Sequence, residues 1–285
     1  MSDAAPTAVS APALAEAVAR ALPAGSPRQL AVLFTAPAQR PQVEALYAFE
    51  AELRRIVGAE SHEAAHARLQ WWRGEIDRLQ GGRPAHPLAC ALLPLRESLP
   101  RLGEMLHEAL AGADLDLARF TYRDWRELEA YCFRSAGSLQ TLIAAGLAAP
   151  RPASDAEQSF ARSLGSALRQ CEMLVQLRTD RSRGRLYLPL AVLEAASLDP
   201  AGFSDDNPRL GLVMTQWRAR LAQALADLPA MLPAVEERRT QRHGLVLAAV
   251  LGHGLDGRST GSVARPDAAP LRSLWTAWRT ALRYR

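Results

Sequence analysis

The sequence predicts an all-α fold, and three observations support this prediction. Alanine, leucine, arginine, glutamate and glutamine are abundant in the 285 residues, whereas β-branched residues are sparse. Apolar residues recur every three or four positions over long stretches. No internal repeat and no flexible linker interrupts this pattern. We therefore expect one helical domain over residues 26–285, preceded by a flexible N-terminal segment with a short helix over residues 1–25.

The boundaries of the predicted helices are marked by residues that start or stop helices. Pro12 suits a first helical position, and Gly81-Gly82 ends a helix. Thr121-x-x-Asp124 and Ser154-x-x-Glu157 are typical of N-terminal capping boxes. The predicted helices cover residues 12–22, 39–56, 61–80, 87–95, 102–111, 122–148, 155–178, 208–227, 233–251 and 270–283.

Composition narrows the class of protein. The formal charge of +4 is mild and spread along the chain, which argues against a nucleic-acid partner. Cys90, Cys132 and Cys171 are widely spaced in apolar surroundings, so we expect no disulfide framework or zinc knuckle. The acidic start lacks a signal-peptide pattern, and the most apolar stretch, 245–251, is far shorter than the ~20 residues that span a bilayer. We expect a cytoplasmic protein without a transmembrane helix.

A polar stripe accompanies the apolar face of the helix predicted over residues 155–178. Glu172, Gln176 and Asp180 stand at positions i, i+4 and i+8, so a helix that continues through them points all three to one side. Hard divalent cations prefer carboxylate oxygens, which makes Glu172 and Asp180 the candidate metal ligands. The alternative is a polar face in contact with solvent.

Several short segments, taken in order, resemble one family. They are Tyr47-Ala48-Phe49, Leu69-Gln-Trp-Trp-Arg73, Tyr131-Cys132 with Ala136-Gly137-Ser138, Gly165-x-Ala167, and Arg183-Gly-Arg-Leu-Tyr-Leu-Pro189. This series is similar to the squalene and phytoene synthases. The resemblance implies the isoprenoid synthase fold, a single-domain helical bundle around a central apolar cleft. The residues it places on the cleft are Phe49, Glu50, Arg54, Arg55, Tyr131, Gly137, Gln140 and Leu168.

The resemblance also implies an activity, the magnesium-dependent head-to-head condensation of two allylic diphosphates, farnesyl or geranylgeranyl. The family's first acidic motif, however, falls here on Arg54, Arg55 and Gly58. If the chain were active, Asp180, Glu172, Gln176 and Tyr187 would carry the reaction, with Mg²⁺ on Glu172 and Asp180. We expect instead a non-catalytic relative without a cofactor that binds a lipid, an isoprenoid or a protein, similar to the branch associated with assembly of respiratory complex I.

Two hypotheses concern the arginines near this cleft. Arg54 and Arg55 would face Glu172 and Asp180 and form ion pairs where a metal would otherwise join the two walls. Changing both arginines to Asp would then cost stability unless magnesium is added. Separately, Arg181, Arg183 and Arg185 around Gly184 would suit a diphosphate or an anionic lipid headgroup, the alternative being a solvated basic loop.

Two further features point elsewhere. His62-Glu63-Ala64-Ala65-His66 matches the HExxH pattern of zinc hydrolases, with Glu97, Glu104 or His107 as the available third ligand. Leu271 to Arg283 forms a helix with an apolar stripe flanked by arginines. Such a helix docks on its own domain, binds a protein partner or lies on the inner face of a membrane.

Overall fold

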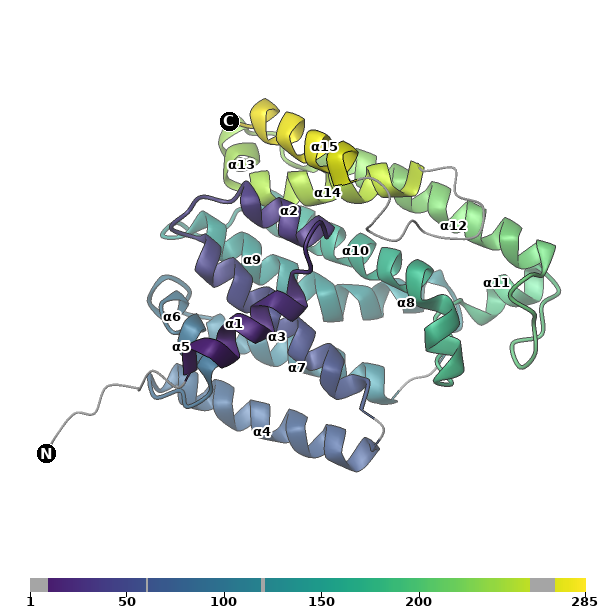
Figure 1. The fold of residues 1–285 in the computed structure, drawn as a ribbon, viewed down its shortest axis with the longest axis horizontal. Coiled ribbons are helices and arrows are strands. Elements are labelled where there is room, and N and C mark those ends of the chain that lie inside the picture. The colour runs from purple at the N-terminus through teal and green to yellow at the C-terminus, as the bar shows by residue number, and fades with distance from the viewer. Residues whose placement is uncertain (1–9, 60, 119–120, 257–269) are drawn as a thin grey trace, which may run out of the picture.

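Helices make up almost all of the regular structure in the computed structural model, which describes residues 10–59, 61–118, 121–256 and 270–285 (Figure 1). Within these ranges the only β-pairing is an isolated bridge between Thr121 and Leu186. The predicted all-α class is confirmed. None of the helices described is long and apolar enough to cross a membrane.

In chain order, the elements are α1 (Ser10–Ala21), α2 (Pro27–Leu33), α3 (Arg40–Val57), α4 (His62–Gln80), α5 (Pro87–Leu92), α6 (Leu95–Ser98), α7 (Leu102–Ala118), α8 (Trp125–Cys132), the π-helical turn η1 (Phe133–Gly137), α9 (Ser138–Ala148), α10 (Asp155–Ser182), α11 (Leu190–Ala195), α12 (Pro208–Asp227), the 3₁₀ turn η2 (Leu228–Met231), α13 (Val235–Thr240), α14 (Arg242–Asp256) and α15 (Pro270–Arg283).

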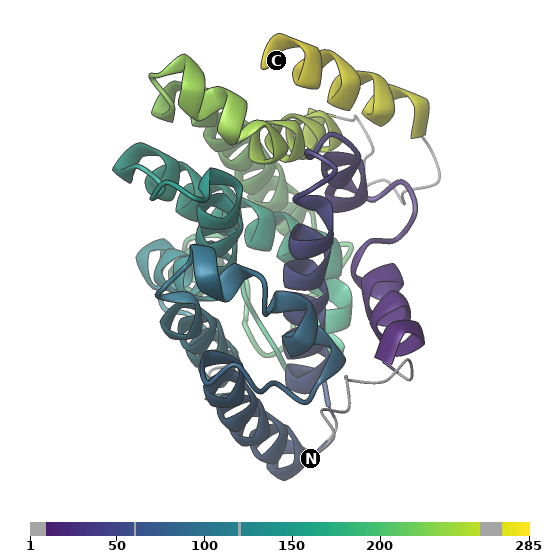
Figure 2. The same cartoon turned by 90° about the vertical axis from the view of Figure 1, so that its left-hand side faces the viewer.

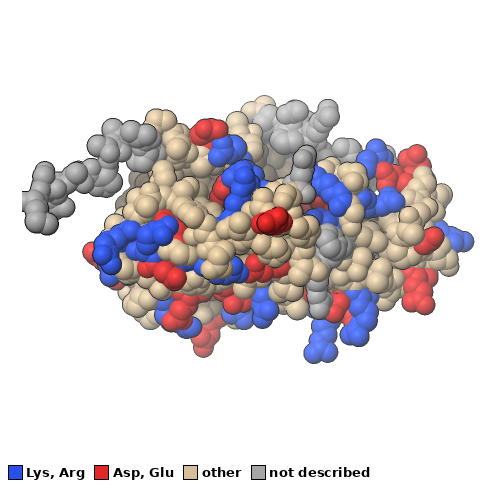
Figure 3. Space-filling view, turned by 90° about the horizontal axis from the view of Figure 1, so that it is seen from below, with Lys and Arg blue, Asp and Glu red and all other residues tan. Residues whose placement is uncertain are grey.

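The helices are arranged from α4 at one side of the molecule to α15 at the other (Figures 1 and 2). α4 packs on α7, α7 on α3 and α9, α9 on α10, α10 on α12, α12 on α14, and α14 on α15. Two hydrophobic clusters lie between these layers, one around Phe49 and Leu69 and the other around Phe160 and Trp217. The face on the α4 side carries basic and acidic side chains interspersed rather than gathered in a patch of one sign (Figure 3).

Helix starts are set by caps, and one predicted cap is different in the structure. Ser154 accepts a hydrogen bond from the backbone of Glu157, whose side chain accepts one in return, as the capping box predicts. Thr121 does not cap a helix; Asp124 does, by accepting from the backbone N–H of Glu127. The helix predicted over residues 122–148 therefore begins at Trp125, and it continues to Ala148 as α8, the π-helical turn η1 and α9 without a gap. The prediction also lacked α2, which Ser26 caps ahead of Pro27.

The N-terminal helix belongs to the packed domain. α1 corresponds to the short helix that we expected within residues 1–25, and it lies on α3 and buries Ala17 and Ala21. Residues 1–9 lie outside the described residues.

The π-helical turn η1 is held between two glycines on neighbouring helices. A Cβ at Gly112 of α7 would lie 2.7 Å from Ser135 Cα, and one at Gly165 of α10 would lie 2.6 Å from Gly137 Cα. Only hydrogen at these positions lets α7 and α10 approach η1 so closely. π-helical turns occur often at functional sites, and η1 directly follows Tyr131 and Cys132.

The C-terminus of α10 ends in a Schellman motif. Gly184 has a φ of +75°, its N–H donates to the carbonyl of Arg181, and the N–H of Arg185 donates to the carbonyl of Asp180. A glycine adopts this left-handed conformation without strain. The turn directs the chain back along α10, so that Arg185 and Tyr187 reach the interior.

Candidate functional site

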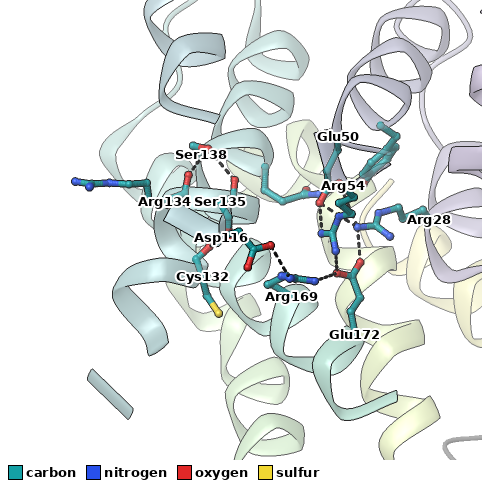
Figure 4. Close-up of polar contacts among 12 residues, drawn as sticks. Arg28, Glu50, Arg54, Asp116, Cys132, Arg134, Ser135, Ser138, Arg169 and Glu172 are labelled. Carbon is teal, nitrogen blue, oxygen red and sulfur yellow. Dashed lines mark hydrogen bonds and ion pairs between the residues drawn. The ribbon is translucent and has the colours of Figure 1, made fainter. Parts of the chain in front are cut away.

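Ion pairs join three helices at the centre of the candidate site (Figure 4). Glu50 and Arg54 lie one turn apart on α3, Glu172 lies on α10, and Arg28 lies on α2. Arg28 donates to Glu172 over 2.6 Å and to both oxygens of Glu50 over 3.2 Å. Arg54 donates to both Glu50 and Glu172. We call these four residues the ion-pair cluster; it satisfies both carboxylates with guanidinium groups.

Asp116 of α7 lies at the centre of a second group of polar contacts. Its carboxylate accepts hydrogen bonds from Tyr187 Oη at 2.7 Å and from Arg185 at 3.3 Å, and Arg169 approaches it at 3.4 Å. Arg169 also donates to the hydroxyl groups of Tyr131 and Tyr187. Asp116 is only 6% exposed, so this group is a buried polar network that links α7, α8 and α10 to the turn after α10.

Burial and charge act in opposite directions on the two acids of the α10 stripe. Burial favours the neutral form of Glu172, but Arg54, Arg28 and Arg169 outweigh it and lower the pKa to about 2. For Asp180, burial dominates and raises the pKa, with Arg169 partly opposing it. Asp180 Oδ2 is buried and has no hydrogen-bond partner. Glu172 is therefore a fixed anion, whereas Asp180 is poised nearer to protonation.

A cavity of about 460 Å³ opens beside these groups, within the range of ligand sites in proteins. Its lining is rich in charge: Arg20, Arg28, Glu50, Glu52, Arg54, Arg55, Asp116, Arg169, Glu172, Asp180, Arg183 and Arg185, with Gln176 and Tyr187. Seven of these side chains are basic and five are acidic, so the lining carries a small excess of positive charge.

The apolar space behind the ion-pair cluster is small. It is lined by Leu53, Ala109, Ala113, Tyr131, Leu139 and their neighbours, and it shares Glu50, Arg54 and Arg169 with the charged cavity. Its volume is about 40 Å³, room for about three water molecules. The expected central apolar cleft is thus largely filled by side chains, and the ion-pair cluster stands at its entrance.

The structure brings some of the predicted site residues together and places others elsewhere. Glu172, Gln176, Asp180, Arg183, Arg185 and Tyr187 share the charged cavity. Arg181 instead contacts Asp205 and the ring of Phe203, because its position on α10 points away from the cavity. The three predicted arginines therefore do not form one anion site. Arg185 is buried and donates to the backbone oxygen of Val57 and to Asp116. Arg183 is exposed, so it is more accessible to a ligand than Arg185.

Several residues expected on the cleft are packed in the interior instead. Phe49 contacts the edge of Trp72, and Leu168 lies in the hydrophobic cluster around Phe160. Gly137 lies against Arg162, and Gln140 is buried with its amide 3.4 Å from Tyr47 Oη. None of these four lines either cavity described above. The physical reason is the close packing of η1 and α9 against α10 and α7.

Arg54 and Arg55 have different ion-pair partners, because adjacent residues of a helix point in different directions. Arg54 points to Glu172, whereas Arg55 lies about 100° further round α3 and pairs with Glu52 near the surface. Asp180 has no ion pair with either. All four residues line the charged cavity, but of the expected ion pairs only Arg54–Glu172 is present, since Arg55 pairs with Glu52 instead.

This difference gives a direct prediction for the arginine pair. We expect Arg54→Asp to lower the melting temperature by several degrees, because it places a third carboxylate beside Glu50 and Glu172. Arg55→Asp removes a half-exposed pair and is expected to change stability by less than about 1 kcal/mol. Thermal unfolding of both variants checks this; equal losses would contradict it.

The HExxH segment does not form a metal site with other described side chains. His62 and His66 lie on the exposed face of the first turns of α4, with ring centroids 6.1 Å apart. Within the described ranges, no three His, Cys, Asp or Glu side chains are grouped as metal ligands. His107, one of the candidate third ligands, is bonded to Asp77. The zinc-hydrolase alternative thus lacks a third ligand.

Arg28 and Asp116 were not among the residues predicted for the site. The prediction ended the α7 helix at Ala111, seven residues before its actual end at Ala118, and so left Asp116 outside it. The apolar period of Leu106, Ala109, Leu110, Ala113 and Leu117 continues past Ala111 and was the available signal. The signal for α2 was the capping pair Ser26-Pro27. No local pattern indicated that Arg28 contacts Glu50 and Glu172, which lie 22 and 144 positions further along the chain.

Comparison with known proteins begins with the fold. A crystal structure of a dehydrosqualene synthase in complex with a ligand superposes with a TM-score of 0.75 over 96% of this chain and 98% of its own, at 17% identity. The squalene synthase HpnC from Alicyclobacillus acidocaldarius gives a TM-score of 0.63 over 97% of each chain, at 19% identity. The chain is thus an all-α protein with the fold of these synthases.

Sequence comparison identifies the family. The squalene/phytoene synthase family model matches residues 23–257, and the chain belongs to this family. Phytoene synthase 3 of Zea mays is 29% identical over 217 residues, which are 74% of this chain and 50% of that protein. The 15-cis-phytoene synthase of Synechocystis is 26% identical over 200 residues, 67% of this chain and 58% of that protein. The chain therefore spans about half the length of the curated relatives that it matches.

The donor set at the site does not fit the magnesium ions on which this family typically depends. A hard cation needs several carboxylate oxygens that are free to bind it. Here Glu50 and Glu172 are engaged by Arg28 and Arg54, and the opposite wall presents Arg54 and Gly58 in place of acids. Of the other acids that line the cavity, Glu52 pairs with Arg55 and Asp116 accepts from Tyr187 and Arg185, whereas one oxygen of Asp180 has no hydrogen-bond partner within the described ranges.

Proposed function

We propose that this chain is a non-catalytic member of the squalene/phytoene synthase family that binds an anionic, phosphate-bearing lipid or isoprenoid in the charged cavity. The observation that carries this proposal is the ion-pair cluster, in which Arg28 and Arg54 neutralise Glu50 and Glu172. Magnesium-dependent ionisation needs carboxylates that are free to bind the metal, and Arg28 and Arg54 both engage Glu172, one of the two candidate ligands. The small apolar space behind the cluster also supports it, since 40 Å³ is far below the volume of a ligand pocket.

A protein-binding role, similar to that of an assembly factor, is compatible with the same features. The cluster stabilises the fold without any reaction, and a family fold without turnover is a scaffold for binding. The charged cavity is the more specific feature, so the proposal gives it priority.

The second candidate function is an active head-to-head prenyltransferase. One observation favours it: Asp180 keeps a buried, unpaired oxygen in a cavity that also holds Arg183 and Tyr187. Incubation with farnesyl or geranylgeranyl diphosphate and Mg²⁺, followed by measurement of pyrophosphate, separates the two candidates. We expect no release above the protein-free reaction. Release that disappears in Asp180→Asn would overturn the proposal.

The binding half of the proposal is tested separately with inorganic pyrophosphate in a calorimeter, without magnesium. Arg183→Gln is expected to weaken binding about tenfold, because a charge-assisted contact to phosphate contributes ~1.5 kcal/mol or more. Arg178→Gln is the matched control, since Arg178 lies on the last turns of α10, close in sequence to its C-cap Arg183, but pairs with Asp205 and does not line the cavity. Equal affinity of the wild-type chain and both variants would remove Arg183 from the site.

A further inference from the structure

The C-terminal helix α15 is turned with its large apolar side chains outward. The side chains that it packs against the domain are small or polar, with Ala277 fully buried and Ala281 only 6% exposed. By contrast, Leu271 is 78% exposed, Trp275 58% and Trp278 44%, and Leu274 and Leu282 are also exposed. A helix that only closes a core buries its leucines and tryptophans, so this orientation calls for another explanation.

Three stripes run along α15, as its helical period shows. Leu271, Leu274, Trp275, Trp278 and Leu282 fall within about 100° of one another around the axis, opposite Ala277 and Thr280. Arg272, Arg279 and Arg283 form a separate stripe about 100° from the centre of the apolar one. The alanine stripe faces α14, on which α15 packs at the edge of the molecule (Figures 1 and 2).

The charge of this face is of one sign. The sequence of α15 contains three arginines and no acidic residue. No acidic side chain within the described ranges forms an ion pair with Arg272, Arg279 or Arg283. Arg279 and Arg283 also line a groove between α12, α14 and α15, and no acidic residue is among the described residues that line this groove. The positive charge of the stripe is thus available to an external partner.

We propose that α15 is a membrane-surface anchor that lies in the plane of a bilayer containing anionic lipids, with Trp275 and Trp278 at the level of the headgroups. Tryptophan is favoured at the membrane–water interface, and leucines beside it enter the acyl boundary. Arginines near an anionic surface add electrostatic attraction to the headgroups. A protein partner would explain the apolar stripe, but the unpaired arginines on its flank favour a surface of many negative headgroups. This inference is independent of what the cavity binds.

Vesicle sedimentation of the whole chain tests the anchor. With vesicles of phosphatidylcholine containing about 30 mol% phosphatidylglycerol, we expect binding that weakens as salt rises from ~0.1 M to ~1 M. Trp275→Ser with Trp278→Ser is expected to lower the partition constant at least about tenfold on every vesicle. Arg272→Gln, Arg279→Gln and Arg283→Gln together are expected to abolish the preference for anionic vesicles.

Trp71→Ser is the matched control, because Trp71 is similarly exposed but lies on α4 at the opposite side of the molecule (Figure 1). It is expected to bind vesicles as the wild-type chain does. Thermal unfolding shows whether each variant is folded, and the mutated side chains of α15 are exposed enough to leave it unchanged. Two results would overturn the proposal: no binding to anionic vesicles, or a dimer in light scattering that only the tryptophan variant dissociates, without vesicle binding.

Discussion

Replacing Glu172 by glutamine is expected to destabilise the fold by about 3–5 kcal/mol, the largest effect of any single change at the site. Glu172 is the acid that Arg28 and Arg54 share, and Arg169 lies 3.6 Å from it. The amide keeps the shape but leaves buried guanidinium groups without their counter-charge. Glu104→Gln, which removes an exposed pair with Arg101, is the control and is expected to cost less than ~0.5 kcal/mol.

The same variant has a defined pH dependence. The pKa of Glu172 is about 2 in the folded protein against an ordinary 4.5, so its contribution to stability is complete above pH 4.5 and is lost as the pH falls from 4.5 towards 2. The difference between the wild-type chain and Glu172→Gln should therefore be constant near pH 7 and shrink below about pH 4. Urea unfolding over this range measures it. A difference that does not depend on pH would show that the altered hydrogen bonds to Arg28 and Arg54, and not the charge, matter.

Gly165→Ala is expected to destabilise the protein by about 3 kcal/mol, at the upper end of the cost of overpacking. The added methyl group would lie 2.6 Å from Gly137 Cα, and backbone cannot rotate away as a side chain does. α10 and η1 must then separate, which disturbs the contact of Arg169 with Tyr131 on either side of this junction.

Gly146→Ala is the matched control for this substitution. Gly146 is also a helix-interior glycine, in α9, and its Cβ would lie 3.4 Å from a flexible leucine side chain. Here we expect no loss and a gain of up to ~1 kcal/mol from helix propensity. Denaturant unfolding of both variants is the measurement. A Gly165→Ala protein as stable as the Gly146→Ala protein would contradict the close approach of α10 to η1.

Site residues could be predicted from the sequence where their positions depend on the geometry of a single helix. The spacing of Glu172, Gln176 and Asp180 predicted one wall of the cavity, because side chains one turn apart lie on the same face of α10. The residues after Gly184 could be assigned to the site for a similar local reason. The Schellman motif at Gly184 turns the chain so that Arg185 and Tyr187 point inward.

Site contacts could not be predicted where they depend on packing between segments far apart in the sequence. The contact of Arg28 with Glu172 spans 144 positions, and no local pattern encodes it. The π-helical turn η1 inside the expected 122–148 helix packs against two glycines from other helices, which periodicity within the segment does not reveal. Arg54 and Arg55 were treated alike because they are adjacent, although adjacent helical residues point about 100° apart.

The ion-pair cluster has a consequence for any ligand of the charged cavity. Glu50 and Glu172 already hold Arg28 and Arg54, so an incoming phosphate meets two intramolecular competitors rather than empty donors. Binding there is an exchange of one anion for another, and its net free energy is the difference between the two sets of contacts. A ligand that uses Arg183 avoids this exchange, whereas one that takes Arg28 breaks its ion pair with Glu172 between α2 and α10. Ligand selection in this cleft is thus a competition with the protein's own side chains.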